Sequence, residues 1–261
     1  MGFTATLQVS RIYVSTVYHL DRIVGYTIHC PIQIHAYSRE CSKMRPIVIA
    51  LLNTKGGVGK STLTCNLAIA ARADFGRVAI LDTDPQHTLS QWWQLRGEPA
   101  DVQVFSDAAS AKDGTEALAR DGWDTIFIDT PGQFIRALKD AAAAADFVLL
   151  PIRAAAFDLA STRDGITICS EMGVPFRVVL NDVITGERFA DETREFLRQH
   201  KVPVLDLQVQ HRSTYIAAAA QGKAAAEIAG GHHARTEMTA VWMEIKKLAI
   251  AAQATRRETT R

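Results

Sequence analysis

The sequence lacks a long hydrophobic run and any strong excess of charge. Its longest apolar stretch, Ala141 to Ile152, is interrupted by Asp146 and is much shorter than the roughly 20 residues that a membrane-spanning helix needs. Lysine and arginine number 29 against 28 acidic residues, so no overall field attracts the chain to nucleic acid or lipid. We expect no membrane partner, and an anionic partner requires a local basic patch.

Cysteines are few, and none belongs to a C-x-x-C pair; they are Cys30, Cys41, Cys65 and Cys169. The N-terminus also lacks the basic, apolar and small-residue layout of a secretory signal. We therefore expect a cytoplasmic protein with reduced thiols. His29 and His35 lie near the first two cysteines, but their spacing matches no compact zinc pattern, so we interpret the group as a chance cluster.

What the sequence does contain is typical of a globular protein. Apolar residues make up 48% of its 261 residues, charged residues 22%, and the composition excludes a disordered or low-complexity class. Charge is unevenly spread, because the net charge is +2 in residues 1–43, −5 in residues 44–200 and +4 in residues 201–261. The last quarter is therefore where an anionic partner is expected.

The first 43 residues differ in texture from the rest. They contain four of the five tyrosines and show no helical period, and the pattern changes abruptly at Met44. We interpret residues 1–43 as an N-terminal extension, which a misassigned start codon would explain; a short extra strand or a partner-binding arm is the alternative. Residues 44–261 contain no repeat or Gly/Ser linker and are expected to form one domain.

From Met44 onward, strand-like and helix-like runs alternate. The expected strands are Ile47–Leu52, Val78–Leu81, Val102–Phe105, Thr125–Ile128, Phe147–Pro151 and Arg177–Leu180. The expected helices are Ser61–Arg72, Thr88–Arg96, Gly114–Arg120, Phe134–Ala144, Leu159–Glu171, Ile216–Gln221 and about Arg235–Ala254. This alternation predicts an α/β fold, with a doubly wound, mostly parallel sheet covered by helices on both faces.

A glycine-rich loop, Asn53 to Thr62, lies between the first strand and the first helix. Its glycines let backbone N–H groups approach phosphate oxygens, and the helix N-terminus adds partial positive charge. Lys60 is placed to reach the β and γ phosphates, and the Ser61 hydroxyl to bind Mg²⁺. The loop predicts ATP and Mg²⁺ as ligands, whereas a plain glycine turn would not explain the lysine and the hydroxyl residues.

Lys55 is a second lysine at the head of this loop. Two lysines close together repel each other unless additional negative charge is present, so Lys55 is expected to point at phosphate, plausibly on a facing subunit. The run Lys55-Gly-Gly-Val-Gly-Lys-Ser-Thr62 resembles the deviant Walker A box of the ParA/MinD class of dimerising ATPases, which have the P-loop NTPase fold.

The resemblance implies that Lys55 acts across an ATP-dependent homodimer. It also implies a set of residues that bind the nucleotide: Gly56, Gly57, Val58, Gly59, Lys60, Ser61 and Thr62.

Two aspartate motifs end later strands. Leu81-Asp82-Thr83-Asp84-Pro85-Gln86 is similar to the ParA switch motif, which implies that Asp84 orients the attacking water and that Asp82 lies nearer the metal. Asp129 ends a Walker B-like strand and is expected to hold Mg²⁺ through water. Strand C-termini lie on the ligand-binding edge of such sheets. No committed base is evident beyond Asp84, so we expect slow intrinsic hydrolysis that a partner stimulates.

Asn181 follows a late strand and resembles the adenine-side asparagine of the family, with a plain loop cap as the alternative. The run Gln210-His-Arg212-Ser-Thr-Tyr215 resembles the ParA pattern in which an arginine and an aromatic residue open a helix that glycine ends. The resemblance implies binding of DNA without sequence preference through basic residues of this region, namely Arg212, Lys223, Lys246 and Lys247. Solvated surface charges are the alternative interpretation.

The chain is most similar to short plasmid ParA partition ATPases that lack an N-terminal helix-turn-helix domain. That resemblance implies nucleoid-associated dimers, released by a ParB-like centromere-binding adaptor. The alternatives are a positioning ATPase for a protein assembly such as a carboxysome or chemoreceptor array, and a scaffold that does not hydrolyse ATP. A MinD-like membrane regulator is disfavoured, because the C-terminal residues 251–261 contain no bulky apolar anchor.

Overall fold

The computed structural model describes residues 45–259, apart from residues 75, 154–157 and 187. The predicted extension, residues 1–43, and its histidine and cysteine group lie outside the described residues. Among the residues that are described, no helix combines the length and apolar character needed to cross a membrane. The two cysteines that the structure describes, Cys65 and Cys169, are buried free thiols.

Strands and helices alternate along the described chain. The strands are β1 Ile47–Leu51, β2 Val78–Asp82, β3 Val102–Phe105, β4 Thr125–Asp129, β5 Phe147–Arg153, β6 Phe176–Val183 and β7 Val204–Gln210. The helices are α1 Lys60–Arg72, α2 Thr88–Leu95, α3 Ala111–Arg120, α4 Ile135–Ala144, α5 Asp158–Glu171, α6 Phe189–Gln199, α7 Ser213–Ala219, the 3-10 turn η1 Ala225–Glu227, and α8 His232–Thr259.

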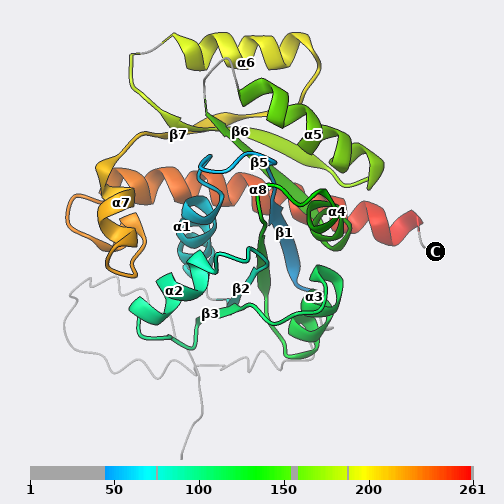
Figure 1. The fold of residues 1–261 in the computed structure, drawn as a ribbon, viewed down its shortest axis with the longest axis vertical. Coiled ribbons are helices and arrows are strands. Elements are labelled where there is room, and N and C mark those ends of the chain that lie inside the picture. Colours follow the sequence, from blue (N-terminus) through cyan, green and yellow to red (C-terminus); the bar gives the residue numbers. More distant parts are fainter. Residues whose placement is uncertain (1–44, 75, 154–157, 187, 260–261) are drawn as a thin grey trace, which may run out of the picture. The chain divides into compact units, whose positions relative to one another are not determined.

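The strands form one seven-stranded parallel sheet in the order β3-β2-β4-β1-β5-β6-β7. β1 is central because it pairs with both β4 and β5. The chain builds one half of the sheet and then returns to build the other, as Figure 1 shows. The predicted doubly wound parallel sheet is confirmed.

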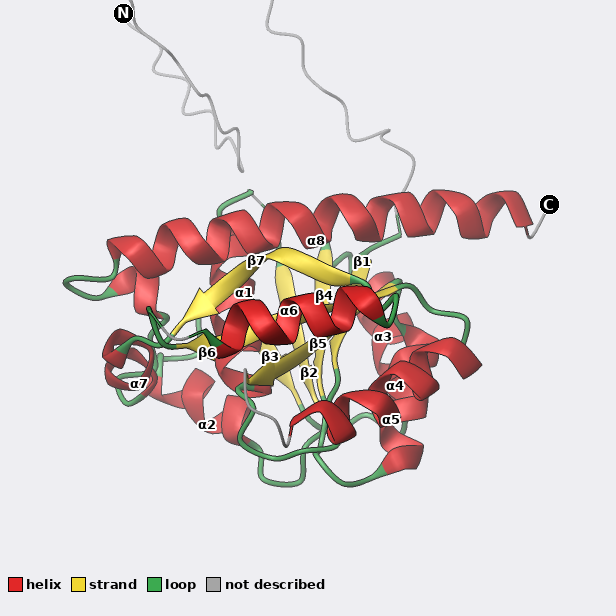
Figure 2. Cartoon of the chain, turned by 90° about the horizontal axis from the view of Figure 1, so that it is seen from above, coloured by secondary structure: helices red, strands yellow, loops and turns green. Residues whose placement is uncertain are grey.

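Helices cover both faces of this sheet because its strands are apolar on both sides. Alternate β1 residues face different cores: Ile49 and Leu51 pack with α1, α2, α7 and α8, whereas Val48 and Ala50 pack with α3, α4, α5 and α6. Figure 2 shows α8 lying across one side of the sheet, with α4 and α5 on the other. A run with apolar residues at every position is what a doubly covered parallel strand requires.

Helix α8 packs against the sheet through one apolar stripe. Met238, Val241, Trp242 and Ile245 are buried, which confirms the predicted core-facing side. Trp242 contacts Phe127 of β4, and its Nε1 donates to the Asp74 carboxylate at 2.6 Å. The helix extends beyond the predicted range at both ends.

Two elements were not predicted from the sequence. β7 is an edge strand, with Asp206 exposed and most of its other residues only partly buried. α6 is amphipathic, with the apolar pairs Phe189–Ala190 and Phe196–Leu197 two helical turns apart. In β7, Leu205, Leu207 and Val209 alternate with polar residues. Both patterns are typical of the elements that form, so they were present in the sequence and went unrecognised.

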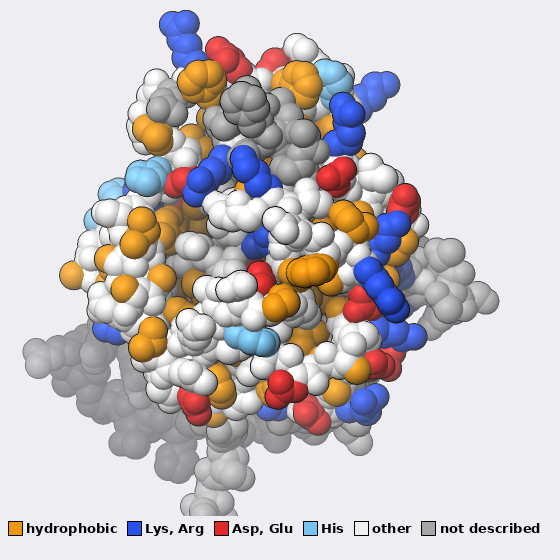
Figure 3. Space-filling view, viewed as in Figure 1, with side chains coloured by type: hydrophobic (Ala, Val, Ile, Leu, Met, Phe, Trp, Pro, Cys, Tyr) orange, Lys and Arg blue, Asp and Glu red, His pale blue; other side chains and the backbone are white. Residues whose placement is uncertain are grey.

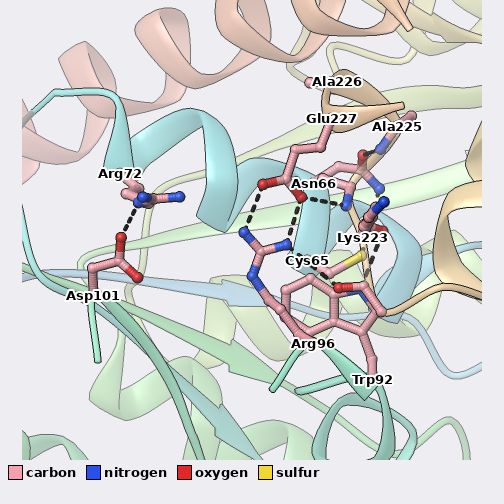
Figure 4. Close-up of polar contacts among 12 residues, drawn as sticks. Cys65, Asn66, Arg72, Trp92, Arg96, Asp101, Lys223, Ala225, Ala226 and Glu227 are labelled. Atoms are coloured by element: carbon pink, nitrogen blue, oxygen red, sulfur yellow. Dashed lines mark hydrogen bonds and ion pairs between the residues drawn. The ribbon is translucent and has the colours of Figure 1, made fainter. Parts of the chain in front are cut away.

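A partly buried polar clamp joins α2 to the turn before α8 (Figure 4). The Arg96 guanidinium forms two bonds with the Glu227 carboxylate, at 2.5 and 2.6 Å, and also reaches the Gly222 carbonyl. Trp92 Nε1 donates to the Lys223 carbonyl at 3.2 Å. Gly222 has φ +65°, and a Cβ there would collide with the backbone of α2. The clamp therefore holds residues 222–227 closely against α2.

We expect Glu227→Gln to lower the free energy of unfolding by about 2 kcal/mol, because the half-buried Arg96 loses its charged partner. Urea denaturation measures the effect. The matched control is Asp206→Asn, which breaks the exposed pair with Arg198 and is expected to change stability by less than about 1 kcal/mol. Equal losses in the two variants would show that burial does not strengthen the clamp.

Candidate functional site

The glycine-rich loop connects the C-terminal end of β1 to α1, which begins at Lys60. Gly59 caps the helix with φ 92°, and a Cβ at this position would collide with the Asn181 side chain. The loop therefore requires glycine both for its left-handed backbone and for close packing. Val58 is buried, whereas Gly56 and Gly57 are exposed.

The two loop lysines have different environments. Lys60 is buried, and its Nζ donates to the carbonyls of Asn53 and Lys55, each at 3.3 Å. Burial lowers the pKa of Lys60, and the negative charges of Asp129 and Asp84 partly oppose that effect. Lys55 is exposed at the head of the loop, and its backbone N–H donates to Asn53 Oδ1. One lysine thus lies inside the loop and the other at the surface.

Asp129, the last residue of β4, is joined to the first turn of α1. Ser61 Oγ donates to Asp129 Oδ2 at 2.6 Å, and Thr64 Oγ1 contacts Oδ1 at 3.3 Å. Burial, aided by the charge of Asp82, raises the pKa of Asp129 to about 7 despite the Ser61 hydrogen bond. Thr64 was not singled out in the sequence, although its position three residues after Ser61 places both hydroxyls on one helix face.

Thr62 is half-buried, and its carbonyl accepts hydrogen bonds from Asn66 Nδ2 and Cys65 Sγ. These bonds tie the first turn of α1 to the next. The predicted nucleotide contact of Thr62 stays a prediction.

Asp82 is aligned with Asp129 by the register of β2 and β4. Its Oδ2 accepts hydrogen bonds from the backbone N–H and hydroxyl of Ser90, and its Oδ1 accepts from the Asp84 N–H. Burial raises the pKa of Asp82, and the Ser90 and Asp84 hydrogen bonds partly offset this. Asp82 therefore holds the loop that connects β2 to α2. Its predicted place nearer the metal stays a prediction.

Asp84 is only partly buried, and its Oδ1 accepts from the Gln86 N–H at 2.9 Å. It lies two residues beyond the end of β2, so its side chain is at the same edge of the sheet as the glycine loop. That position is compatible with the predicted water-orienting role.

Asn181 lies in β6, and its Nδ2 donates to the Val58 carbonyl at 2.7 Å. Asn181 therefore lies within the strand and contacts the distant glycine loop, and both the adenine-side role and the loop cap stay predictions. The next residue, Asp182, has φ +61° and binds His211 Nδ1 and Arg153 Nε through its two carboxylate oxygens. Asn181 thus fastens the glycine loop to the second half of the sheet.

The four predicted DNA-binding cations differ in their contacts. Arg212 Nη2 lies 3.4 Å from Glu237, which also accepts the Tyr215 hydroxyl, and Lys246 pairs with Asp74 at 2.9 Å. Lys223 and Lys247 are exposed. On the face drawn in Figure 3, acidic and basic side chains are interspersed. Two of the four cations therefore hold the fold together as well as carrying charge.

The residues at this edge fit a magnesium nucleotide. Within the described residues, no group of three or more His, Cys, Asp or Glu side chains forms a metal cluster. Ser61, Asp129 and Asp82 alone would coordinate Mg²⁺ incompletely, and Mg²⁺ commonly takes its other ligands from phosphate and water. Lys60 is buried, and its described hydrogen bonds are to carbonyl groups. Its positive charge therefore suits a phosphate group as a ligand.

Without nucleotide, Asp129→Asn is expected to raise the free energy of unfolding at pH 8 by roughly 1–3 kcal/mol, because it removes a buried charge. A carboxyl whose pKa is higher when folded takes up a proton on folding. Its effect on stability is therefore favourable at low pH and is lost as pH rises toward about 7.

The gain from Asp129→Asn should shrink toward pH 5. Urea denaturation in chelator at both pH values measures it, with the exposed Asp107→Asn as control. A variant less stable than wild type at pH 8 would contradict the expectation.

Comparison with known proteins places this geometry in a family. The model of the CobQ/CobB/MinD/ParA nucleotide binding domain matches residues 49–225. The maintenance of carboxysome distribution protein A of Halothiobacillus neapolitanus is 26% identical over 77% of this chain and 97% of its own length. The protein of the same name from Gloeobacter kilaueensis is 33% identical over 69% of this chain and 84% of its own length.

A solved structure has the same fold. The plasmid partition protein of Borrelia burgdorferi bound to AMPPNP superposes with a TM-score of 0.60 at 17% identity, covering 76% of this chain and 99% of that one. At this identity the likeness concerns the fold. The family match covers the glycine loop, both aspartate motifs and Asn181, so the chain belongs to the CobQ/CobB/MinD/ParA family of nucleotide-binding domains.

Proposed function

We propose that this chain is a magnesium-dependent ATP hydrolase that ATP binding switches into a homodimer, and that the dimer positions a cargo in the cytoplasm. The observation that carries the proposal is the pair of loop lysines, with Lys60 buried against loop carbonyls and Lys55 exposed at the head of the loop. A buried lysine suits the chain's own triphosphate. An exposed one is placed to serve a facing subunit.

The described residues supply the positioning and charge that phosphoryl transfer requires. The backbone of residues 56–62 and Lys60 would bind the phosphates, and Ser61 with Asp129 would hold Mg²⁺. Mg²⁺ held there would neutralise part of the phosphate charge. Asp84 would orient the attacking water from the edge of β2. No stronger base lies in the described contacts of this edge, which is consistent with slow intrinsic turnover.

Dimerisation across the nucleotide edge is supported by exposed apolar side chains beside it. Phe134 and Ile135 follow the loop after Asp129, and 59% and 44% of their surfaces are exposed. Large exposed apolar side chains commonly mark contact surfaces. Together with Lys55, they give this edge both apolar area and positive charge for a second copy.

A protein assembly is the cargo we favour. The two relatives named as carboxysome distribution proteins match over most of their length, and the one from Gloeobacter kilaueensis is 33% identical. DNA partition through a ParB-like adaptor is the second candidate, and the net charge of +4 in residues 201–261 favours a DNA track in either case.

Deletion of the gene in its own host distinguishes the two cargoes. Mispositioned protein assemblies with normal plasmid retention support assembly positioning. Plasmid loss with normally placed assemblies supports partition instead.

The lysine pair gives a direct test by two alanine variants. Lys60→Ala is expected to lose nucleotide binding, because it removes the buried cation. Lys55→Ala should bind ATP as a monomer and fail to dimerise, and Lys112→Ala on α3 is the matched control. Fluorescent nucleotide titration and sedimentation with ADP, ATP and a slowly hydrolysed analogue measure these steps. Normal dimerisation of Lys55→Ala would exclude the cross-subunit role.

A separate prediction concerns the binding of duplex DNA by the exposed lysines. Lys223→Ala combined with Lys247→Ala should weaken binding of duplex DNA about tenfold at low salt and leave stability unchanged, because both side chains are exposed. Arg212→Ala should instead lower the free energy of unfolding, because Glu237 would lose its cation. Filter binding across a salt series and urea denaturation separate the two effects. Unchanged DNA binding in the double variant would show that neither lysine contacts DNA.

A further inference from the structure

A groove of about 1230 Å³ lies at the edge of the sheet opposite the glycine loop. Its walls are the first residue of β5, the turn from α5 into β6, and the last turns of α8. In a parallel sheet the strands begin at one edge and end at the other, and the candidate nucleotide site lies where they end. The groove is therefore remote from the nucleotide site on the same domain.

Four arginines line this groove, and none of the described lining residues is an aspartate or glutamate; the arginines are Arg45, Arg177, Arg256 and Arg257. We call it the arginine groove. Behind it, Asp146 is fully buried, and its Oδ2 accepts from the Val48 N–H and from Gln253 Nε2. Its Oδ1 lies 3.1 Å from Arg45 Nη2 and 3.9 Å from Arg256 Nη1. This buried carboxylate thus lies within ion-pair distance of two of the four guanidinium groups.

Two acidic groups interact with the arginines of the groove. Asp146 offsets part of the charge of Arg45 and Arg256, and Glu244 on α8 interacts electrostatically with Arg177. Among the described lining residues themselves, the charged groups are the four guanidinium groups. Arginine presents a planar fork that matches carboxylate geometry, so the rim is suited to acidic groups.

Apolar side chains supply the rest of the lining. Phe147, Val174 and Leu248 line the groove together with Ala251 and Ala252. A concave site with apolar lining and a charged rim fits a ligand that carries both kinds of group. A DNA duplex presents phosphates on a convex surface and has no apolar side chain to fill such a groove, so its chemistry fits less well.

We propose that the arginine groove docks an acidic peptide segment of a partner protein, with an apolar side chain of that segment seated against Leu248, Ala251 and Ala252 of α8. The site does not depend on the function proposed above. Because it lies at the far edge of the sheet, two copies facing each other through their nucleotide edges would leave both grooves open. One dimer could then hold two partner segments.

The test uses a short fluorescent peptide in which pairs of glutamates alternate with leucine and phenylalanine. Fluorescence anisotropy with the full chain is expected to show saturable binding that Arg177→Glu combined with Arg257→Glu weakens at least about tenfold, equivalent to about 1.4 kcal/mol. Lys112→Glu combined with Arg120→Glu makes the same charge change on α3 and should leave the affinity unchanged.

Two further measurements test whether the apolar lining of the groove contributes to peptide binding. Ala251→Trp should weaken peptide binding by filling the groove without changing its charge, and a peptide with serine in place of leucine and phenylalanine should bind more weakly. Nucleotide binding and thermal unfolding report whether each variant is folded.

No saturable binding by the wild type, or equal affinity in the wild type and the Arg177/Arg257 variant, overturns the proposal. So does binding of duplex DNA that requires these two arginines and that the peptide does not displace. Loss of self-association in the same variant, with unchanged peptide binding, would identify a second copy as the occupant instead.

Discussion

The hydrogen bond between Ser61 and the buried Asp129 is the contact on which the site depends. It joins the end of a central strand to the first turn of the helix that follows the glycine loop. Asp129 is aligned with Asp82 in the next strand, so the fold holds two carboxylates at the edge where Lys60 is also buried. Charges held in this way would favour a cation and a polyanion over water.

The loop between Asp82 and α2 is also connected to the C-terminal quarter of the chain. Asp82 holds Ser90 at the start of α2, and Arg96, at the end of that helix, holds Glu227. The chain of contacts therefore runs from the nucleotide edge along α2 to the exposed Lys223. Because each link is a short polar contact and the first and last are at least partly buried, α2 and residues 222–227 are expected to move as one body.

Much of this arrangement could be predicted from local patterns. The continuous apolar strands, the glycine loop and the aspartates at strand ends each carry a short-range signal, and the resulting sheet and family are confirmed. The pairing of Arg212 with Glu237 and of Lys246 with Asp74 could not be predicted, because those partners meet only after α8 has packed against α7 and the end of α1. α6 and β7 could have been predicted, because α6 has an apolar face and β7 alternates apolar and polar residues.

The central position of β1 has a consequence for how the protein is made. β1 emerges from the ribosome early, yet its two neighbours are β4 and β5, and its Val48 N–H is bonded to a carboxylate 98 residues later. Contacts between distant residues form slowly because long loops must close first. During translation this apolar segment must therefore remain without a strand partner until β4 has been synthesised, and chaperone capture at that stage would protect it from aggregation.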